Sequence, residues 1–165
     1  LSETPLAAGS CSWNTMRARH CNWVRLRDRK SGAEFRVLDI HLDHKSDDAR
    51  REQMKMIVGE CAQYADGFPQ IICGDFNSGI ENAPVACLRD AGWQEAYEAV
   101  HGPGEAGFTY HGFKGPDYRK KNARRIDFIF VRGNLQPVAA EILRDKVDGL
   151  YPSDHYFLMS DFIIQ

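Results

Sequence analysis

Residues 71–80, IICGDFNSGI, carry an apolar run directly into Gly74 and then into an acid, an aromatic and an amide. Side chains of a strand alternate between its two faces. Alternation therefore predicts that Asp75 and Asn77 share one face and that Phe76 points the opposite way, into packing. Asp, Asn, Ser and Gly are also the residues that turns prefer, so an ordinary turn explains this stretch equally well when it is taken alone.

The residues before this stretch predict a strand followed by a helix. Residues 33–44, AEFRVLDIHLDH, alternate apolar Leu38, Ile40 and Leu42 with polar Asp39, His41 and Asp43. Residues 47–67 repeat apolar side chains at helical spacing, with acids at the start and Gly67 as a stop signal. A strand, a helix and a strand in this order indicate a crossover unit of a mixed α/β fold.

The residues after this stretch predict a short helix and then mainly strands. Asn82 is a suitable cap for a helix that continues to about Ala91, before Gly92. Apolar, β-branched and aromatic residues predict three strands, within residues 124–133, 137–145 and 154–164. The intervening residues 102–125 predict a long exposed connection around a short strand near 108–113, and such connections are usually functional.

The composition is that of one ordinary domain. The chain has 165 residues, of which 43% are hydrophobic and 27% charged, and its net charge is -2. A protein that holds DNA by bulk electrostatics is normally basic, so a nucleic-acid substrate would need a local cluster of cations. No run approaches the ~20 apolar residues of a membrane span. Because the sequence opens on Leu1, we expect a processed product or a fragment, and its localisation is not predicted.

Polar groups sit beside apolar runs at four places in the chain. Asp127 interrupts the apolar strand RRIDFIFVRG, where a carboxylate is costly unless paired, and His155, directly after Asp154, is a suitable partner. A Ser-Asp-His turn also occurs as an ordinary strand entry, and a single strand histidine such as His41 is more often structural. Four such places in one short domain nevertheless favour convergence on one pocket.

The motifs DIHLDH, GDFN, RIDFIF and SDH, in this order, resemble those of the endonuclease/exonuclease/phosphatase superfamily, which includes pancreatic deoxyribonuclease. The opening 32 residues are similar to a bacterial branch of it. The resemblance covers residues 1–165 and implies an α+β fold, a four-layer αββα sandwich of two face-to-face, mainly antiparallel sheets flanked by helices. It also implies metal-dependent hydrolysis of a phosphodiester or phosphomonoester by activated water.

The resemblance implies catalytic roles for five matching residues. Asp75 would activate or orient the attacking water, and Asn77 would hold that water or a phosphate oxygen. His155, oriented by Asp127, would stabilise the negative charge that develops at phosphorus. His41 would be a second imidazole donor to the phosphate.

The resemblance further implies metal and substrate contacts. Asp154 would help to bind Mg²⁺ or Mn²⁺, cations that prefer oxygen ligands. Arg19 would contact a substrate phosphate, with Arg17 as an open alternative. Arg124 lies in the basic run YRKKNARR, which would suit nucleic acid, although a solvated charged loop explains the run equally well. Nucleotide, lipid and phosphomonoester substrates stay open.

One departure from the family concerns completeness. Family members carry an asparagine and a metal-binding glutamate in an N-terminal half that would precede Leu1. We therefore expect that this chain lacks that half and needs it, or another chain, to complete the fold. The resulting bare sheet face is expected to consist of Leu38, Ile40, Ile72, Ile126, Phe128 and Phe130. A non-catalytic binding or structural module, or an inactive fragment, is the alternative function.

Overall fold

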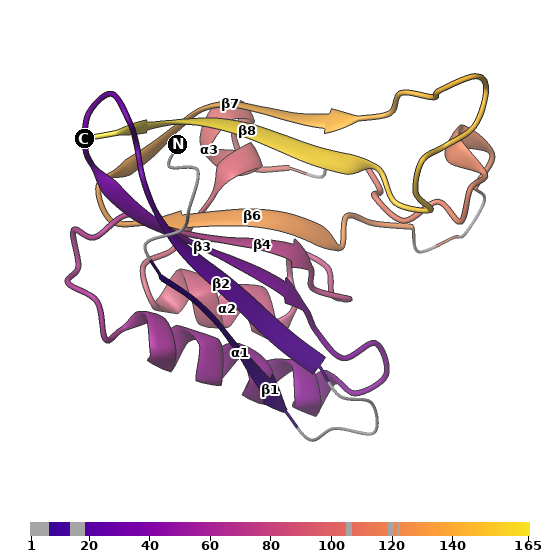
Figure 1. The fold of residues 1–165 in the computed structure, drawn as a ribbon. Coiled ribbons are helices and arrows are strands. Elements are labelled where there is room, and N and C mark those ends of the chain that lie inside the picture. Colours follow the sequence, from indigo (N-terminus) through magenta and orange to yellow (C-terminus); the bar gives the residue numbers. More distant parts are fainter. Residues whose placement is uncertain (1–6, 14–18, 105–106, 119–120, 122) are drawn as a thin grey trace.

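In the part of the chain that the structure describes, two sheets and four short or medium helices make up the fold (Figure 1). The computed structural model describes residues 7–13, 19–104, 107–118, 121 and 123–165. The larger sheet has the order β1-β2-β3-β4-β6-β5, and β7 pairs with β8 in the smaller one. The strands are β1 (Ala7–Trp13), β2 (Arg19–Arg27), β3 (Glu34–His41), β4 (Gln70–Asp75), β5 (Gln94–Glu95), β6 (Asp127–Arg132), β7 (Leu135–Leu143) and β8 (Phe157–Ile164). The helices are α1 (Asp47–Cys61), α2 (Ala83–Asp90), α3 (Ala96–His101) and the 3₁₀ helix η1 (Gly115–Asp117).

The predicted crossover unit is confirmed. Strands β3 and β4 are parallel and are connected through α1, whereas the other strand pairs are antiparallel. The side chain of Ser46 caps α1 by accepting a hydrogen bond from the backbone of Ala49. The helix ends at Cys61, earlier than the stop predicted at Gly67, because turns lead from it into β4.

The apolar face of the larger sheet is covered by α1 and α2 (Figure 1). Leu38, Ile72 and Phe128 are fully buried on this face and belong to one core with Ile57 and Leu88 of the helices. The expectation of a bare face at Leu38, Ile40, Ile72, Ile126, Phe128 and Phe130 was therefore wrong. Alternation identifies which residues share a face, but it does not identify the element that covers them. The opposite face of the sheet is turned toward β7 and β8.

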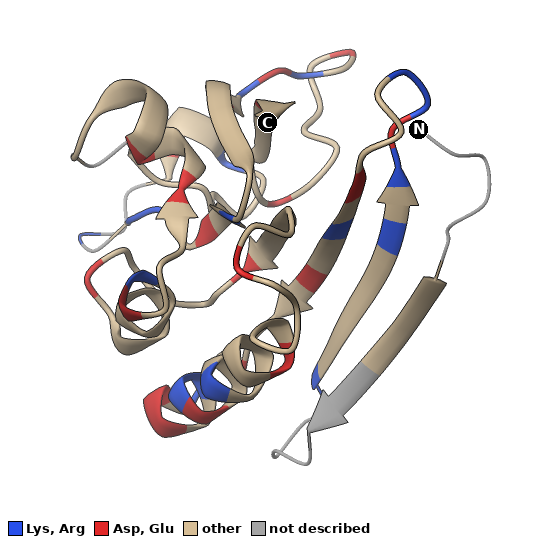
Figure 2. Cartoon of the chain, turned by 90° about the vertical axis from the view of Figure 1, so that its left-hand side faces the viewer, with Lys and Arg blue, Asp and Glu red and all other residues tan. Residues whose placement is uncertain are grey.

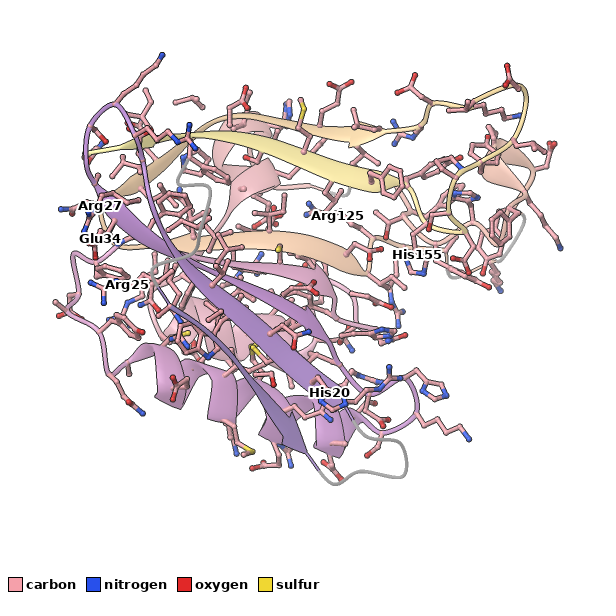
Figure 3. All side chains as sticks on the ribbon, viewed as in Figure 1. His20, Arg25, Arg27, Glu34, Arg125 and His155 are labelled. Atoms are coloured by element: carbon pink, nitrogen blue, oxygen red, sulfur yellow. The ribbon has the colours of Figure 1, made fainter. Side chains whose placement is uncertain are left out.

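Two other parts of the fold differ from the sequence-based expectation. The strand expected near residues 108–113 is reduced to a single bridge between Tyr110 and His155. Strands β1 and β2 were not predicted. In β2, charged residues interrupt the pattern of apolar residues that would indicate a strand. Arg25 and Arg27 pair with Glu34 across the β2–β3 hairpin (Figure 3), so these charges stabilise the strand pair.

Charges of both signs are mixed along α1, as Figure 2 shows. Ion pairs between Arg51 and Asp48 and between Lys55 and Glu52 connect successive turns of this helix. Within the described ranges, no helix combines the length and the apolar content needed to cross a bilayer.

The close approach of β3 and β4 requires glycine at residue 74. Gly74 has φ of +134°, and a Cβ placed on it would lie 2.0 Å from the carbonyl oxygen of Ile40. We expect Gly74→Ala to lower the free energy of unfolding by about 3 kcal/mol or more, measured by chemical denaturation. Gly59→Ala is the control, because no atom lies within 4 Å of the added Cβ in α1. It should stabilise the protein by about 0.5–1 kcal/mol.

Candidate active site

Three polar side chains form a row across the ends of neighbouring strands. The register pairs His41 of β3 with Asp75 of β4, and Asp75 with Asp127 of β6. His41 Nε2 lies 3.3 Å from Asp75 Oδ2. Because directly paired residues point to the same face of a sheet, the row faces the space between the two sheets.

His155 extends this row from the second sheet. It precedes β8, and its Nδ1 lies 2.8 Å from Oδ2 of Asp127, within hydrogen-bond distance. Its backbone N–H donates to Ser153 Oγ at 3.1 Å, which fixes the turn into β8. Figure 3 shows His155 at the end of the space between β6 and β8. The contact predicted between Asp127 and His155 is therefore present, and it joins the two sheets.

The row lines an open pocket of about 530 Å³. Strands β3, β4 and β6 supply one wall, and the segment from Ser153 to Leu158 supplies the other. The polar side chains of the wall include those of Asp39, His41, Asp75, Asp127, Ser153, Asp154 and His155. Convergence of the four sequence motifs on one pocket is thus observed.

The environment of Asp75 favours its protonated form. Burial raises the pKa of this carboxyl group, and the neighbouring Asp127 carboxylate adds to the increase. A hydrogen bond of 2.7 Å from the backbone N–H of Asn77 to Oδ1 acts in the opposite direction. Asp75 is therefore a stronger base than an exposed aspartate, as a group that accepts a proton from water should be.

The environment of His155 favours its charged form. Its hydrogen bond to Asp127 raises the pKa of the imidazole, with burial opposing this effect. Negative charge on Asp75 and Asp154 raises the pKa further. A positively charged imidazole at the pocket wall can stabilise an anion bound there.

Asn77 is hydrogen-bonded to Asp75 through its backbone N–H. The predicted alternation of strand faces does not apply to it, because Asn77 lies beyond the end of the strand. Strand β4 ends at Asp75, and Asn77 follows in a left-handed conformation with φ of 49°. Its side-chain Nδ2 donates to the carbonyl oxygen of Leu42 at 3.1 Å. The amide thus connects the loop after β4 to the end of β3. Phe76 is fully buried against Phe128, as predicted.

The predicted arginines lie outside the row. Arg19 Nη2 is 2.8 Å from His44 Nδ1, at the β3 end that also carries His41. Arg124 lies against Gly79, where an added Cβ would be 2.7 Å from the Arg124 Cδ. Arg17 falls outside the described residues.

The donor set of the pocket suits a metal ion. Among the described residues, Asp75, Asp127 and His155 bring one ligand atom each within 4.8 Å of one another. Carboxylate oxygens are the ligands that Mg²⁺ and Mn²⁺ prefer. Asp154, the ligand predicted from sequence, lines the same pocket but is not a member of this three-residue group.

Tyr110 is a pocket neighbour that sequence reasoning did not assign to the site. Its ring lies 5.0 Å from the ring of His155, centroid to centroid, in an edge-on arrangement. Tyr110 lies in the connection of residues 102–125, called the glycine-rich connection below. In its sequence, only the apolar and aromatic character of residues 108–113 indicated an ordered segment.

Residues 11–155 match the model of the Endonuclease/Exonuclease/phosphatase family. The chain belongs to this family. The family includes nucleases and phosphatases that hydrolyse phosphate esters with the help of metal ions. No curated protein matches the sequence.

Solved structures share the fold at low sequence identity. A conserved protein of unknown function from Enterococcus faecalis has 22% identity and a TM-score of 0.84, with 98% of this chain and 67% of that chain covered. A mannosyl-6-phosphatase from Bacteroides thetaiotaomicron has 20% identity and a TM-score of 0.82, with 97% and 67% covered. TDP2 from D. rerio, complexed with a single-stranded DNA product, has 18% identity and a TM-score of 0.77, with 96% and 68% covered. The chain thus spans about two thirds of each of these proteins.

The ion pair between Asp127 and His155 predicts a specific titration. By NMR in metal-free buffer, the His155 ring should titrate above the ordinary 6.5, and Asp127→Asn should lower its midpoint. Because the folded-state pKa is raised, the pair stabilises the fold fully below about pH 6.5 and loses this effect as pH rises through the folded value. Asp48→Asn, which removes an exposed carboxylate of α1, is the control. An unchanged midpoint in Asp127→Asn would contradict the assignment.

Proposed function

We propose that this chain supplies the catalytic face of a metal-dependent phosphoesterase that hydrolyses a phosphodiester or phosphomonoester with an activated water. The observation that carries this proposal is the row His41, Asp75 and Asp127, continued by His155, along one wall of an open pocket. The row combines a buried carboxylate of raised pKa with a histidine that favours its charged form. Hydrolysis of a phosphate ester needs both a proton acceptor and a stabiliser of negative charge.

Asp75 is the proposed proton acceptor. Its Oδ1 is held by the Asn77 backbone, and its Oδ2 lies near His41. The carboxylate is therefore fixed in orientation before substrate arrives. Its increased basicity strengthens its hydrogen bond to a water molecule and assists removal of a proton as the water attacks phosphorus.

His155 and His41 are the proposed donors to the phosphate. Asp127 accepts from His155 Nδ1, which leaves Nε2 of that ring available for an oxygen of the phosphoryl group. His41 lies on the other side of Asp75 and is exposed to the pocket. Both imidazoles can stabilise the negative charge that grows as the ester bond breaks.

Mg²⁺ or Mn²⁺ would be held in the pocket with Asp154, which lines it, as the proposed ligand. When bound, such an ion polarises the phosphoryl group and neutralises part of its charge. The Asp127 carboxylate is already hydrogen-bonded to His155, so we assign it to positioning that ring.

Substitution of the proposed proton acceptor or charge stabiliser should abolish most of the activity. In the form of the protein that hydrolyses a test ester, Asp75→Asn and His155→Ala should each lower kcat by about a hundredfold or more. His20→Ala and Asp90→Asn are matched controls at exposed positions and should keep normal activity. Activity within a factor of two for a folded Asp75→Asn or His155→Ala variant would overturn the proposal and favour a non-catalytic module.

Nucleic acid is the proposed polymeric substrate class, and small phosphate esters are the alternative. Arg124 lies near Gly79 and Arg19 lies near His44, and both would contact phosphates beyond the reacting one. Two fold neighbours are a sugar phosphatase and a protein bound to single-stranded DNA product. Comparing hydrolysis of an oligonucleotide and of a small monoester, with and without Mg²⁺, decides between the two classes.

We also propose that further polypeptide completes the smaller sheet. The inner face of β7 and β8 and the opposite sheet leave a second space of about 370 Å³, lined mainly by Phe35, Ile71, Leu135, Phe162 and Ile164. The described part of the chain supplies only β7 as a hydrogen-bonded neighbour of β8. An N-terminal half of the same protein, or another chain, would cover this apolar wall.

This proposal predicts weak activity for the isolated 165 residues. Without the covering segment, the pocket stays open to water and lacks the ligands that the segment would add, so both Mg²⁺ binding and ester hydrolysis should be weak. On the same sample, calorimetry measures Mg²⁺ binding, an ester assay measures turnover, and sedimentation measures the oligomeric state. Full turnover by a monomeric 165-residue preparation would show that the chain completes its own site.

A further inference from the structure

Thr109 makes an unusual set of contacts beside the site. Its side chain is fully buried within the glycine-rich connection. Its Oγ1 accepts hydrogen bonds from the backbone N–H groups of Ile126 and Asp127, at 3.1 and 3.3 Å. These two residues enter β6, so one hydroxyl group holds the backbone from which the Asp127 carboxylate projects.

The backbone of the same segment holds the residues around His155. The carbonyl oxygen of Thr109 accepts from the N–H of Tyr156 at 2.9 Å. The adjacent Tyr110 forms the single bridge with His155. Thr109 therefore contacts β6 through its side chain and the start of β8 through its backbone.

The rest of this segment is anchored as well. The N–H groups of His111 and Gly112 both donate to the carbonyl oxygen of Asp154, at 2.8 and 3.0 Å. His111 is fully buried, its Nδ1 accepts from the N–H of Gly115, and its ring lies 4.2 Å from that of Tyr156. Residues 109–112 are thus held in place beside the site by several hydrogen bonds.

The hydrogen bond between Asp127 and His155 needs such a support. Asp127 belongs to the larger sheet and His155 precedes a strand of the smaller one, so no strand ladder sets the distance between them. A hydrogen bond weakens steeply when its donor and acceptor move apart or tilt. Within the described residues, Thr109 bonds directly to Asp127 and to the neighbour of His155.

We propose that Thr109 is a positioning residue that sets the Asp127–His155 geometry, and that its hydroxyl group is the part required. The effect on catalysis rests on the proposed phosphoesterase function, whereas the effect on geometry does not. Thr109 is fully buried, and its hydrogen bonds go to the backbones of Ile126, Asp127 and Tyr156.

Two substitutions separate the hydroxyl group from the volume of the side chain. Thr109→Val keeps the shape but leaves the N–H groups of Ile126 and Asp127 without their acceptor. It should lower kcat by about 10–100-fold and change KM less than about threefold, because the contacts to substrate remain. Thr109→Ser keeps the hydroxyl group and should retain kcat within about threefold.

Gln70→Leu is the matched control for a general loss of stability. Gln70 is buried on β4 and donates to the carbonyl oxygen of Cys61, away from the pocket. Removal of this hydrogen bond should lower the melting temperature and leave kcat unchanged. An equal loss of kcat in Gln70→Leu and Thr109→Val, at equal thermal shifts, would reduce Thr109 to a structural residue and overturn the proposal.

NMR tests the geometry without any turnover. In the wild type, the amide protons of Ile126 and Asp127 should be protected from exchange, and the Nδ1 proton of His155 should give a downfield resonance. Thr109→Val should weaken or abolish that resonance, and Thr109→Ser should keep it. Failure of the wild-type protein to hydrolyse any ester, with its covering segment present, would count against the proposed function alone. Freely exchanging amides, or an unchanged His155 resonance in Thr109→Val, would overturn the role of Thr109.

Discussion

The hydrogen bond between Asp127 and His155 is the interaction on which the site depends. It joins the two sheets at the pocket, and both side chains are largely withdrawn from water. Burial of the Asp127 carboxylate in an apolar strand is costly, and the imidazolium of His155 offsets that cost. The same contact raises the pKa of His155. Stability of the sheet junction and charge on the pocket wall thus have one physical origin.

The register of the larger sheet sets the positions of the other polar side chains of the site. His41, Asp75 and Asp127 lie side by side because three neighbouring strands are paired in that register. Gly74 allows the backbone of β4 to approach Ile40 closely, immediately before Asp75. Phe76, immediately after Asp75, packs between Phe128 and Phe130 in the core. The Asp75 carboxylate is thus fixed by both of its neighbours along the chain.

Sequence patterns predicted the elements whose burial is periodic. Alternation in residues 33–44 and the helical spacing after it identified β3, α1 and the crossover to β4, and the isolated Asp127 pointed to a partner such as His155. Strand β2 was not predicted, because its charged residues Arg25 and Arg27 are paired with Glu34 of the next strand, and this pairing is not visible in the sequence of β2 alone. The role of Thr109 was not predicted either. Its buried hydroxyl group bonds to backbone N–H groups 17 and 18 residues away, and such a contact leaves no periodic pattern in the sequence. Long-range hydrogen bonds of this kind become visible only in the fold.

The order of charges along the site favours a cation. Asp75 and Asp127 are paired directly on neighbouring strands, an arrangement that is unfavourable when both carry charge. The two imidazoles flank this acidic pair, His41 beside Asp75 and His155 beside Asp127. The Asp127 charge is compensated by His155, whereas burial, together with the Asp127 charge, raises the pKa of Asp75. A divalent cation near this acidic pair would offset the repulsion between the two carboxylates and favour their ionised forms, which would link metal binding to the ability of Asp75 to orient water.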